Sequence, residues 1–473
     1  MTTWTSLEQK LMMWIEGNRG ELIERTQEML RIESVKGPGE PGSPFGTGTN
    51  EALNYALNIA NSYGLSVKNL DGFAGHAEWV PKGIEGPCEL VGVLAHVDVV
   101  PAGSGWKHPA FGAEIDAGRI YARGAIDDKG PAMAALYAII ALKQCDMLGT
   151  RRVRLILGAD EESGFQCVKH YFENEEMPDM GFTPDADFPL IFAEKGIVNV
   201  AINMPIPKAT NGFSLSQLTA GLRSNMVPDS ANAIVEVDER ATATAVARLN
   251  SVVGIVAKMS PDGVSINVAS QGVSAHGSTP ELGINAVGPL CDSLLLLDLD
   301  DDLSQFLTSV RSLAVDTSGT VLGIDGSDSV SGSLTCNLGT ITCANGIAQI
   351  TFNIRYPVSW NIGDVLTHIQ EYTSRTKLTF EEKEHHPPLH VPQDDPLVRT
   401  LLSVYREDTG DDRPPISIGG GTYARVMRKG VAFGPEFPGG KGGAHEHDES
   451  WGVEELIRAS KIYAKALLRL INA

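Results

Sequence analysis

Residues 90–98 read Leu-Val-Gly-Val-Leu-Ala-His-Val-Asp, an apolar run that ends in a histidine and an aspartate. The first six of these residues have the length and composition of a buried strand. Val153–Gly158 is a second run of the same kind, and the strongly helical stretch Pro131–Leu142 lies between the two. The order strand, helix, strand predicts an α/β domain in which the two strands pair in parallel. In such sheets the chemistry lies at the carboxyl ends of the strands, which is where His96 and Asp98 fall.

A different pattern occupies the middle of the chain. Alternating segments such as Ala233–Val237 and Gln349–Ile354 mix with helical ones, which is typical of an α+β domain with an antiparallel sheet. We therefore predict an α/β protein of two domains. One is discontinuous, with a mixed, mostly parallel sheet, and covers residues 1–195 and 388–473. The other is an inserted α+β domain that covers residues 196–387.

Length and charge limit what the protein can be. A chain of 473 residues is too long for one hydrophobic core, which agrees with two domains. Its 38 basic and 59 acidic residues give a formal net charge of −21, so we expect no binding to nucleic acid or to an anionic membrane through charge.

No apolar stretch approaches the ~20 residues that span a bilayer, and the first ten residues lack the pattern of a signal peptide. The six cysteines include no C-x-x-C pair. We expect a cytoplasmic protein. The acidic run Asp298–Asp302 lacks the spacing and glycine of a calcium loop and is predicted to be a solvated helix end.

The pair His96 and Asp98 is the first candidate for chemistry. Residues two apart in a strand point to the same side of the pleat. This suits a metal-ligating imidazole whose second nitrogen is held by a carboxylate. A simple hydrogen bond between the two side chains at a strand end is an equally good interpretation of this motif alone.

Four further groups of acidic residues or histidines follow along the chain. Asp127-Asp128 stands in a tight turn before the predicted helix, and Glu161-Glu162 follows the second strand. Asp185 follows a proline-set turn, and residues 445–449 (His-Glu-His-Asp-Glu) follow a glycine-rich loop. Adjacent acids beside a buried strand repel each other unless cations compensate them. A capping role for Asp128, and solvent-exposed acids on the other turns, are the alternatives.

The order of these motifs resembles the M20 metallopeptidase family, and in particular its dipeptidase branch of PepV-like and carnosinase-like enzymes. The motifs are His-x-Asp, Gly-x-x-Asp-Asp-Lys-Gly, Glu-Glu, Thr-Pro-Asp and a final His-x-x-Asp-Glu. The resemblance covers nearly the whole chain. It implies a two-domain fold that holds two divalent metal ions, usually zinc. Manganese or cobalt would suit the same oxygen and nitrogen ligands.

The resemblance implies a ligand set for each metal ion. His96, Asp127 and Asp185 would hold one ion, and Asp127, Glu162 and His445 would hold the other, so that Asp127 bridges the two. Three carboxylates and a hydroxide carry four negative charges, which balance two divalent cations while the imidazoles stay neutral. The resemblance also implies a cis peptide bond after Asp127.

Two neighbouring residues resemble the catalytic groups of the family. Glu161 would be the general base, and Asp98 would be the aspartate that orients the ligating His96. His445 is favoured over His447 as the second histidine ligand, because only His445 has the family spacing to the final acidic pair.

The middle domain resembles the lid of the family. Asn225 and His276 would reach the carbonyl oxygen of the substrate. Arg355 would bind the carboxylate of the substrate, because the fork of a guanidinium binds carboxylate through two parallel hydrogen bonds. Backbone N–H groups around Gly420 would help to hold the same carboxylate.

These expectations together predict a metal-dependent dipeptidase. It would hydrolyse dipeptides with free termini through a metal-bridging water that Glu161 deprotonates. The alternatives are an M20-type deacylase of N-acyl amino acids, such as a desuccinylase, and a silent homologue that binds a ligand without turnover. A small peptide is the expected partner, neither nucleic acid nor membrane is expected, and the chain is expected to be a monomer.

Overall fold

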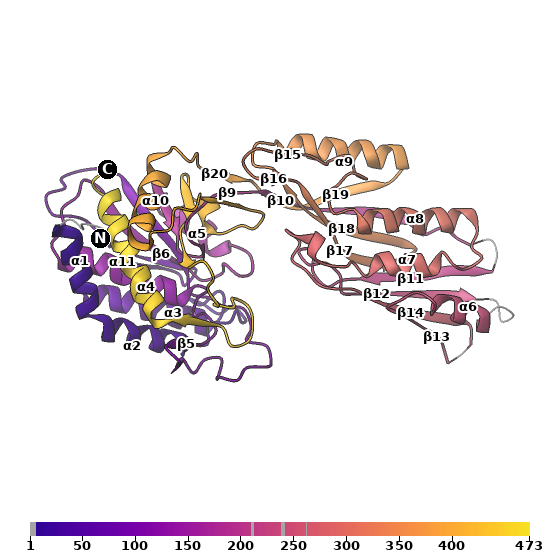
Figure 1. Cartoon of the computed structure of the whole chain (residues 1–473), viewed down its shortest axis with the longest axis horizontal. Coiled ribbons are helices and arrows are strands. Elements are labelled where there is room, and N and C mark those ends of the chain that lie inside the picture. Colours follow the sequence, from indigo (N-terminus) through magenta and orange to yellow (C-terminus); the bar gives the residue numbers. More distant parts are fainter. Residues whose placement is uncertain (1–5, 210–211, 238–241, 262) are drawn as a thin grey trace. The chain divides into compact units, whose positions relative to one another are not determined.

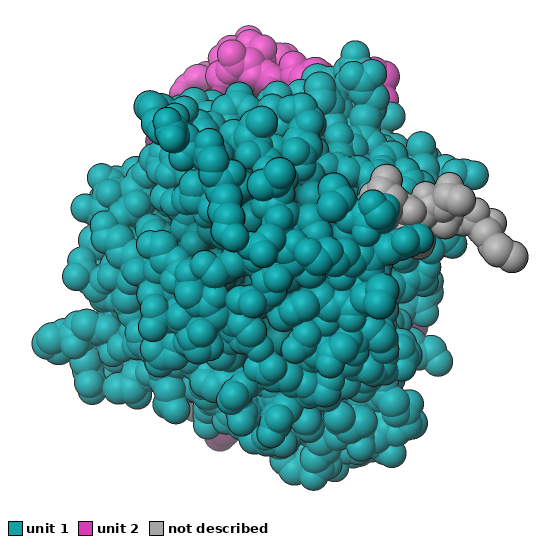
Figure 2. Space-filling model, turned by 90° about the vertical axis from the view of Figure 1, so that its left-hand side faces the viewer, with its two compact units in different colours: residues 1–193, 389–417, 421–473 teal, residues 194–388, 418–420 magenta. Residues whose placement is uncertain are grey.

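The structure is a computed structural model that describes residues 6–209, 212–237, 242–261 and 263–473. The chain divides into two compact units, coloured teal and magenta in Figure 2. Unit 1 comprises residues 1–193, 389–417 and 421–473, and unit 2 comprises residues 194–388 and 418–420. The predicted fold class, α/β with a mixed sheet in a two-domain chain, is confirmed.

Unit 1 is built on a nine-stranded mixed sheet (Figure 1). Its central pairs, β6 with β3, β3 with β7 and β7 with β22, are parallel, and the two pairs on the β1 side are antiparallel. In order across the sheet the strands are β1 (Ser66–Leu70), β2 (Ala74–Trp79), β6 (Arg152–Gly158), β3 (Leu90–His96), β7 (Met180–Thr183), β22 (Gly430–Ala432), β9 (Ile191–Glu194) and β20 (Leu389–His390), with β21 (Ile416–Ile418) also paired to β9.

The predicted parallel pairing fixes where the candidate residues meet. His96 lies opposite Gly158 in the register of β3 and β6. The residues that follow the two strands, Asp98 on one side and Glu161 on the other, therefore emerge at the same edge of the sheet. This agrees with the rule that functional groups gather at the carboxyl ends of parallel strands.

Helix α4 (Lys129–Gln144) is the predicted helix between these strands, and it is buried from Lys129 to Leu142. It packs against β3, α2 and α11 (Figure 1). Near the start of the chain two helices meet at a break at Asn18, whose side chain donates a hydrogen bond to Trp14 O at 2.7 Å. The other helices of unit 1 are α1 (Ser6–Gly17), α2 (Arg19–Leu30), α3 (Thr47–Ser62), α5 (Gln166–Asn174), α10 (Pro396–Thr409), α11 (Val453–Leu470) and the 3-10 turn Tyr423–Val426.

Two small sheets complete unit 1. One joins β24, β5 and β4, and the other pairs β23 with β8 in parallel. Their bounds are β24 (Ser450–Gly452), β5 (Arg119–Tyr121), β4 (Glu114–Asp116), β23 (Pro435–Glu436) and β8 (Ala186–Asp187). Both sheets therefore involve the C-terminal segment that carries His445.

Unit 2 is built on an eight-stranded antiparallel sheet that shares one hydrophobic core with four helices (Figure 1). In order the strands are β13 (Ile255–Met259), β14 (Ser265–Gln271), β12 (Ser230–Val237), β11 (Phe213–Ala220), β17 (Thr335–Ala344), β18 (Ile347–Tyr356), β10 (Gly196–Pro205) and β19 (Thr379–His386). The helices are α6 (Thr242–Leu249), α7 (Val287–Leu294), α8 (Asp301–Val315) and α9 (Ile362–Thr376), with the hairpin β15 (Ser327–Asp328) and β16 (Gly332–Ser333) and the 3-10 turn Pro280–Leu282.

The antiparallel α+β character predicted for this part of the chain is therefore confirmed. The acidic run Asp298–Asp302 is a helix end, as expected, because Asp300 caps α8 by accepting a hydrogen bond from Leu303 N at 3.0 Å. Among the residues that the structure describes, no helix has both the length and the apolar character needed to cross a membrane.

The centre of the unit 1 sheet depends on glycine. Gly181 of β7 lies opposite Gly92 of β3, and a Cβ at Gly181 would overlap the carbonyl oxygen of Gly92. We expect Gly181→Ala to destabilise unit 1 by about 3 kcal/mol and to lower its melting temperature by roughly 6 °C or more, because the backbone of the neighbouring strand has to move. Thermal unfolding followed by circular dichroism measures this.

Gly20→Ala is the matched control. Gly20 lies in α2, and a Cβ there meets nothing within 4 Å. This change should leave stability unchanged or raise it by up to about 1 kcal/mol, since alanine favours helix. Equal melting temperatures for Gly181→Ala and the wild type would contradict the close strand approach.

Candidate metal centre

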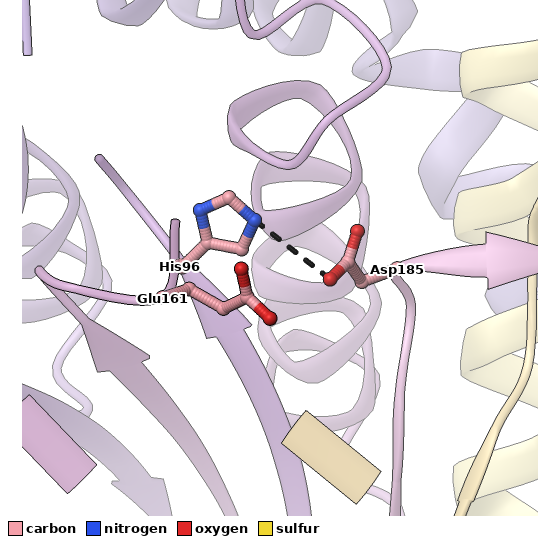
Figure 3. Close-up of side chains that lie close together, drawn as sticks. All are labelled: His96, Glu161 and Asp185. Atoms are coloured by element: carbon pink, nitrogen blue, oxygen red, sulfur yellow. Dashed lines mark ion pairs between the residues drawn. The ribbon is translucent and has the colours of Figure 1, made fainter. Parts of the chain in front are cut away.

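His96 ends β3 and is completely buried. Its Nδ1 lies 2.9 Å from the carbonyl oxygen of Asp98, which can only accept, so Nδ1 carries the proton. Its Nε2 lies 3.0 Å from Oδ1 of Asp127 and 3.8 Å from Oδ2 of Asp185. Figure 3 shows His96 and Asp185 facing each other, with Glu161 beside them. The nitrogen that can ligate a metal thus faces carboxylate oxygens.

Asp127 joins this imidazole to a second one. Its Oδ1 faces His96, and its Oδ2 lies 3.0 Å from Nε2 of His445. Asp127 precedes α4, and the peptide bond between Asp127 and Asp128 is cis, as the family resemblance implies. One carboxylate is therefore shared between two histidines that come from distant parts of the sequence.

The second histidine comes from the C-terminal segment. Nε2 of His445 also lies 3.1 Å from Oε2 of Glu162. The side chain of His445 is 55% exposed, in contrast to the buried His96. His447 lies elsewhere, against Gly105 in the loop after β3.

The turn after β6 carries both glutamates. The carboxylate of Asp98 accepts hydrogen bonds from the backbone N–H groups of Glu161 and Glu162, each at 3.1 Å. The same carboxylate is 3.5 Å from Nδ1 of His96, so Asp98 holds the ring mainly through its own carbonyl oxygen. Asp98 thereby fixes the imidazole with its backbone and the glutamate turn with its side chain.

Two groups of side chains have ligand atoms that all lie within 4.8 Å of one another. One is His96 with Glu161 and Asp185, and the other is His96 with Asp127 and Glu162. Two ligand atoms of one tetrahedral zinc ion at about 2.05 Å are about 3.3 Å apart. The observed separations of 3.0 to 3.8 Å around the two imidazoles fit atoms that share an ion.

The pKa shifts of the cluster also indicate a site for cations. Burial and the nearby Asp127 raise the pKa of Asp185 well above its usual value, and burial together with Asp185 and Glu162 does the same for Glu161. Hydrogen bonds to Asp127 and Glu162 raise the pKa of His445 to about 11. The raised pKa values of Asp185 and Glu161 reflect crowded negative charge, which divalent cations would neutralise. The residues present fit a pair of cations.

Two further buried acids, Asp128 and Glu449, bind backbone N–H groups beside the ligands. Both belong to the sequence motifs, but the motifs do not indicate this role. Asp128 heads α4 but makes no capping hydrogen bond, and its Oδ2 instead accepts from His96 N at 3.1 Å. Glu449 accepts from Ile126 N at 3.1 Å and from Asp127 N at 3.3 Å, and it pairs with the buried Arg123. The signal available in the sequence was that Asp128 directly follows the ligand Asp127 and that Glu449 ends the motif that begins with His445.

The remaining candidates lie in unit 2. Gly277 N donates to Asn225 O at 2.7 Å, which brings Asn225 next to His276, and Nδ1 of His276 lies 2.6 Å from the hydroxyl of Ser278. Arg355 is buried at the end of β18.

The guanidinium of Arg355 donates to Oδ1 of Asn353 at 2.7 Å and to the carbonyl oxygen of Gly419 at 2.9 Å. Gly419 immediately precedes Gly420. The structure thus forms two pairs of neighbours in unit 2, Asn225 with His276 and Arg355 with the Gly419–Gly420 segment.

The family model described as Peptidase family M20/M25/M40 matches residues 92–469. This chain belongs to that family. The M20 peptidase is therefore a hydrolase of peptide bonds, and the match spans all the candidate site residues, from His96 to His445.

Relatives and solved structures agree with this assignment. "Putative dipeptidase YtjP" of Bacillus subtilis (strain 168) is 43% identical over 466 residues, which cover 95% of this M20 peptidase and 97% of the relative. "Putative dipeptidase SSP1012" of Staphylococcus saprophyticus is 35% identical over 460 residues, with 95% and 97% covered. The fold is similar to that of human carnosine dipeptidase 1, with a TM-score of 0.60, 15% identity and 99% of both chains covered.

The two neighbouring histidines of the C-terminal segment provide a test of the metal centre. We expect His445→Ala to lower the affinity for zinc at least about tenfold, because an imidazole that faces Asp127 and Glu162 is lost. His447→Ala should bind zinc like the wild type. Elemental analysis of the metal content after equilibrium dialysis measures the zinc affinity of each variant. Equal affinities in the two variants would contradict the assignment of His445.

Proposed function

We propose that this M20 peptidase is a metal-dependent dipeptidase that hydrolyses dipeptides with free amino and carboxyl termini. The observation that carries the proposal is Asp127, whose two oxygens face two imidazoles as a bridging ligand would. The relatives named as dipeptidases, at 35–43% identity over nearly the whole chain, support the substrate class.

His96, Asp127 and Asp185 would hold one metal ion, and Asp127, Glu162 and His445 the other. Zinc is the metal we propose, with manganese or cobalt as ions that the same ligands would accept. Two such ions, when bound, lower the pKa of a water molecule toward ~7 and polarise the carbonyl of the substrate.

Glu161 would act as the general base. Its backbone is fixed by Asp98, and its carboxylate belongs to the group that contains His96 and Asp185. In this position Glu161 takes a proton from the attacking water and returns it to the leaving amine. Asp98 is thus the residue that positions both the base and the imidazole.

The unit 2 residues would bind the substrate. Arg355 would hold the carboxylate of the dipeptide, with its guanidinium oriented by Asn353 and Gly419. Backbone N–H groups at Gly420 would hold the same carboxylate, and Asn225 and His276 would donate to the carbonyl oxygen of the scissile bond. We propose that the chain acts as a monomer in the cytoplasm.

A panel of free, N-acylated and C-amidated dipeptides tests the activity. We expect hydrolysis of dipeptides with two free termini, in the presence of zinc or manganese, and its loss with a chelator. Release of free amino acids is measured by chromatography. Preferred cleavage of N-acyl amino acids would instead indicate a deacylase, and no turnover with any metal would indicate a binding protein.

The adjacent glutamates give a matched pair for the mechanism. Glu161→Gln should lower kcat by about 10²–10⁴-fold while zinc content stays near that of the wild type, because the base is lost and the ligands remain. Glu162→Gln should lower the zinc affinity itself. Steady-state kinetics and metal analysis on the same preparations distinguish the two. Loss of zinc in Glu161→Gln would mean that Glu161 is a ligand.

A further inference from the structure

A glycine-rich loop, residues 439–443, leads directly to His445 and closes around the side chain of Glu436. A Cβ at Gly440 would overlap Oε1 of Glu436, and a Cβ at Gly442 would overlap Oε2. The backbone of Gly442 also donates a hydrogen bond to this carboxylate. The carboxylate of Glu436 thus occupies the space that a side chain at either position would fill, and a larger residue there would displace it.

The loop is held on both sides of Gly442. Its N–H binds Glu436, and its carbonyl oxygen accepts from Ser450 N at 2.9 Å. Glu446 N donates to Gly443 O at 2.9 Å, which closes the turn around His445. The carboxylate of Glu436 is therefore one of the contacts that hold the segment leading to this histidine.

The position of His445 depends on the contacts that hold its loop. Its side chain is 55% exposed, and its backbone has a φ of +65°, a conformation that non-glycine residues rarely adopt. His96, in contrast, is completely buried at the end of a central strand. Burial in the sheet and hydrogen bonds to Asp98 and Asp128 orient His96, whereas the position of His445 is set by the path of its loop.

Glu436 is itself fixed next to another residue of the cluster. Its strand β23 pairs with β8, which begins directly after Asp185. The carbonyl oxygen of Glu436 accepts from Phe188 N at 2.8 Å, and that of Gly434 accepts from Ala186 N at 2.8 Å. The backbone of Glu436 is thus tied to the strand of Asp185, while its side chain holds the loop of His445.

We propose that Glu436 is a positioning residue of the metal centre. Its carboxylate holds residues 439–443 in the conformation that brings His445 to Asp127 and Glu162, and it thereby sets the affinity for the cation that His445 binds. This proposal rests on the role of His445 as a ligand in the proposed function.

Zinc binding to the full chain in the absence of substrate tests the proposal. Glu436→Ala should weaken the binding of one of the two zinc ions by about 10–100-fold, in the range found for residues that orient metal ligands. The second ion should bind nearly as before, because the backbone pairing next to Asp185 survives the substitution. Glu436→Gln should restore affinity to within about threefold, since its amide oxygen still accepts from Gly442 N.

A double variant shows whether Glu436 acts through His445. Glu436→Ala combined with His445→Ala should bind zinc no more weakly than His445→Ala alone. Lys441→Ala, at an exposed position of the same loop, should bind zinc like the wild type. Melting temperatures of the metal-free proteins should agree within about 2 °C, which separates positioning from a general loss of structure.

The opposite results overturn the proposal. Unchanged zinc affinity in Glu436→Ala, or a double variant weaker than His445→Ala, would remove the positioning role. Because binding is measured without turnover, a failure to hydrolyse dipeptides would overturn the proposed function and leave the role of Glu436 intact.

Discussion

Carboxylates crowded into one buried place repel each other, and the hydrogen bonds around the metal centre hold them in place against this repulsion. Asp127, Glu162 and Asp185 converge on two imidazoles at the edge of the sheet. A second set of acids holds the backbone beneath them, as Asp98 does for the glutamate turn and Glu449 does for Asp127. The ligands are thus oriented by hydrogen bonds from their own N–H groups, and their oxygens stay directed at the place where positive charge is needed.

The sequence predicts the strands that carry this site because each strand depends on residues that are close together in the chain. An apolar run that ends in His-x-Asp gives a strand with two side chains on one face, and a strand, helix, strand order gives the parallel pair β3 and β6. Two helices meet at Asn18 although the helical spacing of apolar residues continues across this position. Periodicity reports which face of a helix is buried, and it does not report a turn that keeps the same face.

Long-range partners could not be predicted. The motif predicts that Asp98 orients His96, and its carboxylate lies 3.5 Å from Nδ1 of that ring. The motif does not show that the same carboxylate also binds the N–H groups of Glu161 and Glu162, about 60 positions away in the chain. That contact depends on the register between two strands. The glycines at 440 and 442 indicated only a glycine-rich loop, because a sequence shows that side chains are missing and cannot show that Glu436 occupies their place. The same is true of Glu449, whose burial follows from its ion pair with Arg123.

The two imidazoles that share Asp127 come from near opposite ends of the chain, and this has a consequence for biosynthesis. A ribosome releases β3, β6 and β7 with His96, Asp127, Glu162 and Asp185 long before His445 is made. The central strand β22 and helix α11 also belong to the last segment, so the sheet itself is incomplete until then. At that stage a nascent chain carries four of the five proposed cation ligands but lacks His445 and a central strand of the sheet. The metal centre is therefore complete only when the segment that carries β22, His445 and α11 has packed onto the strands that were made before it.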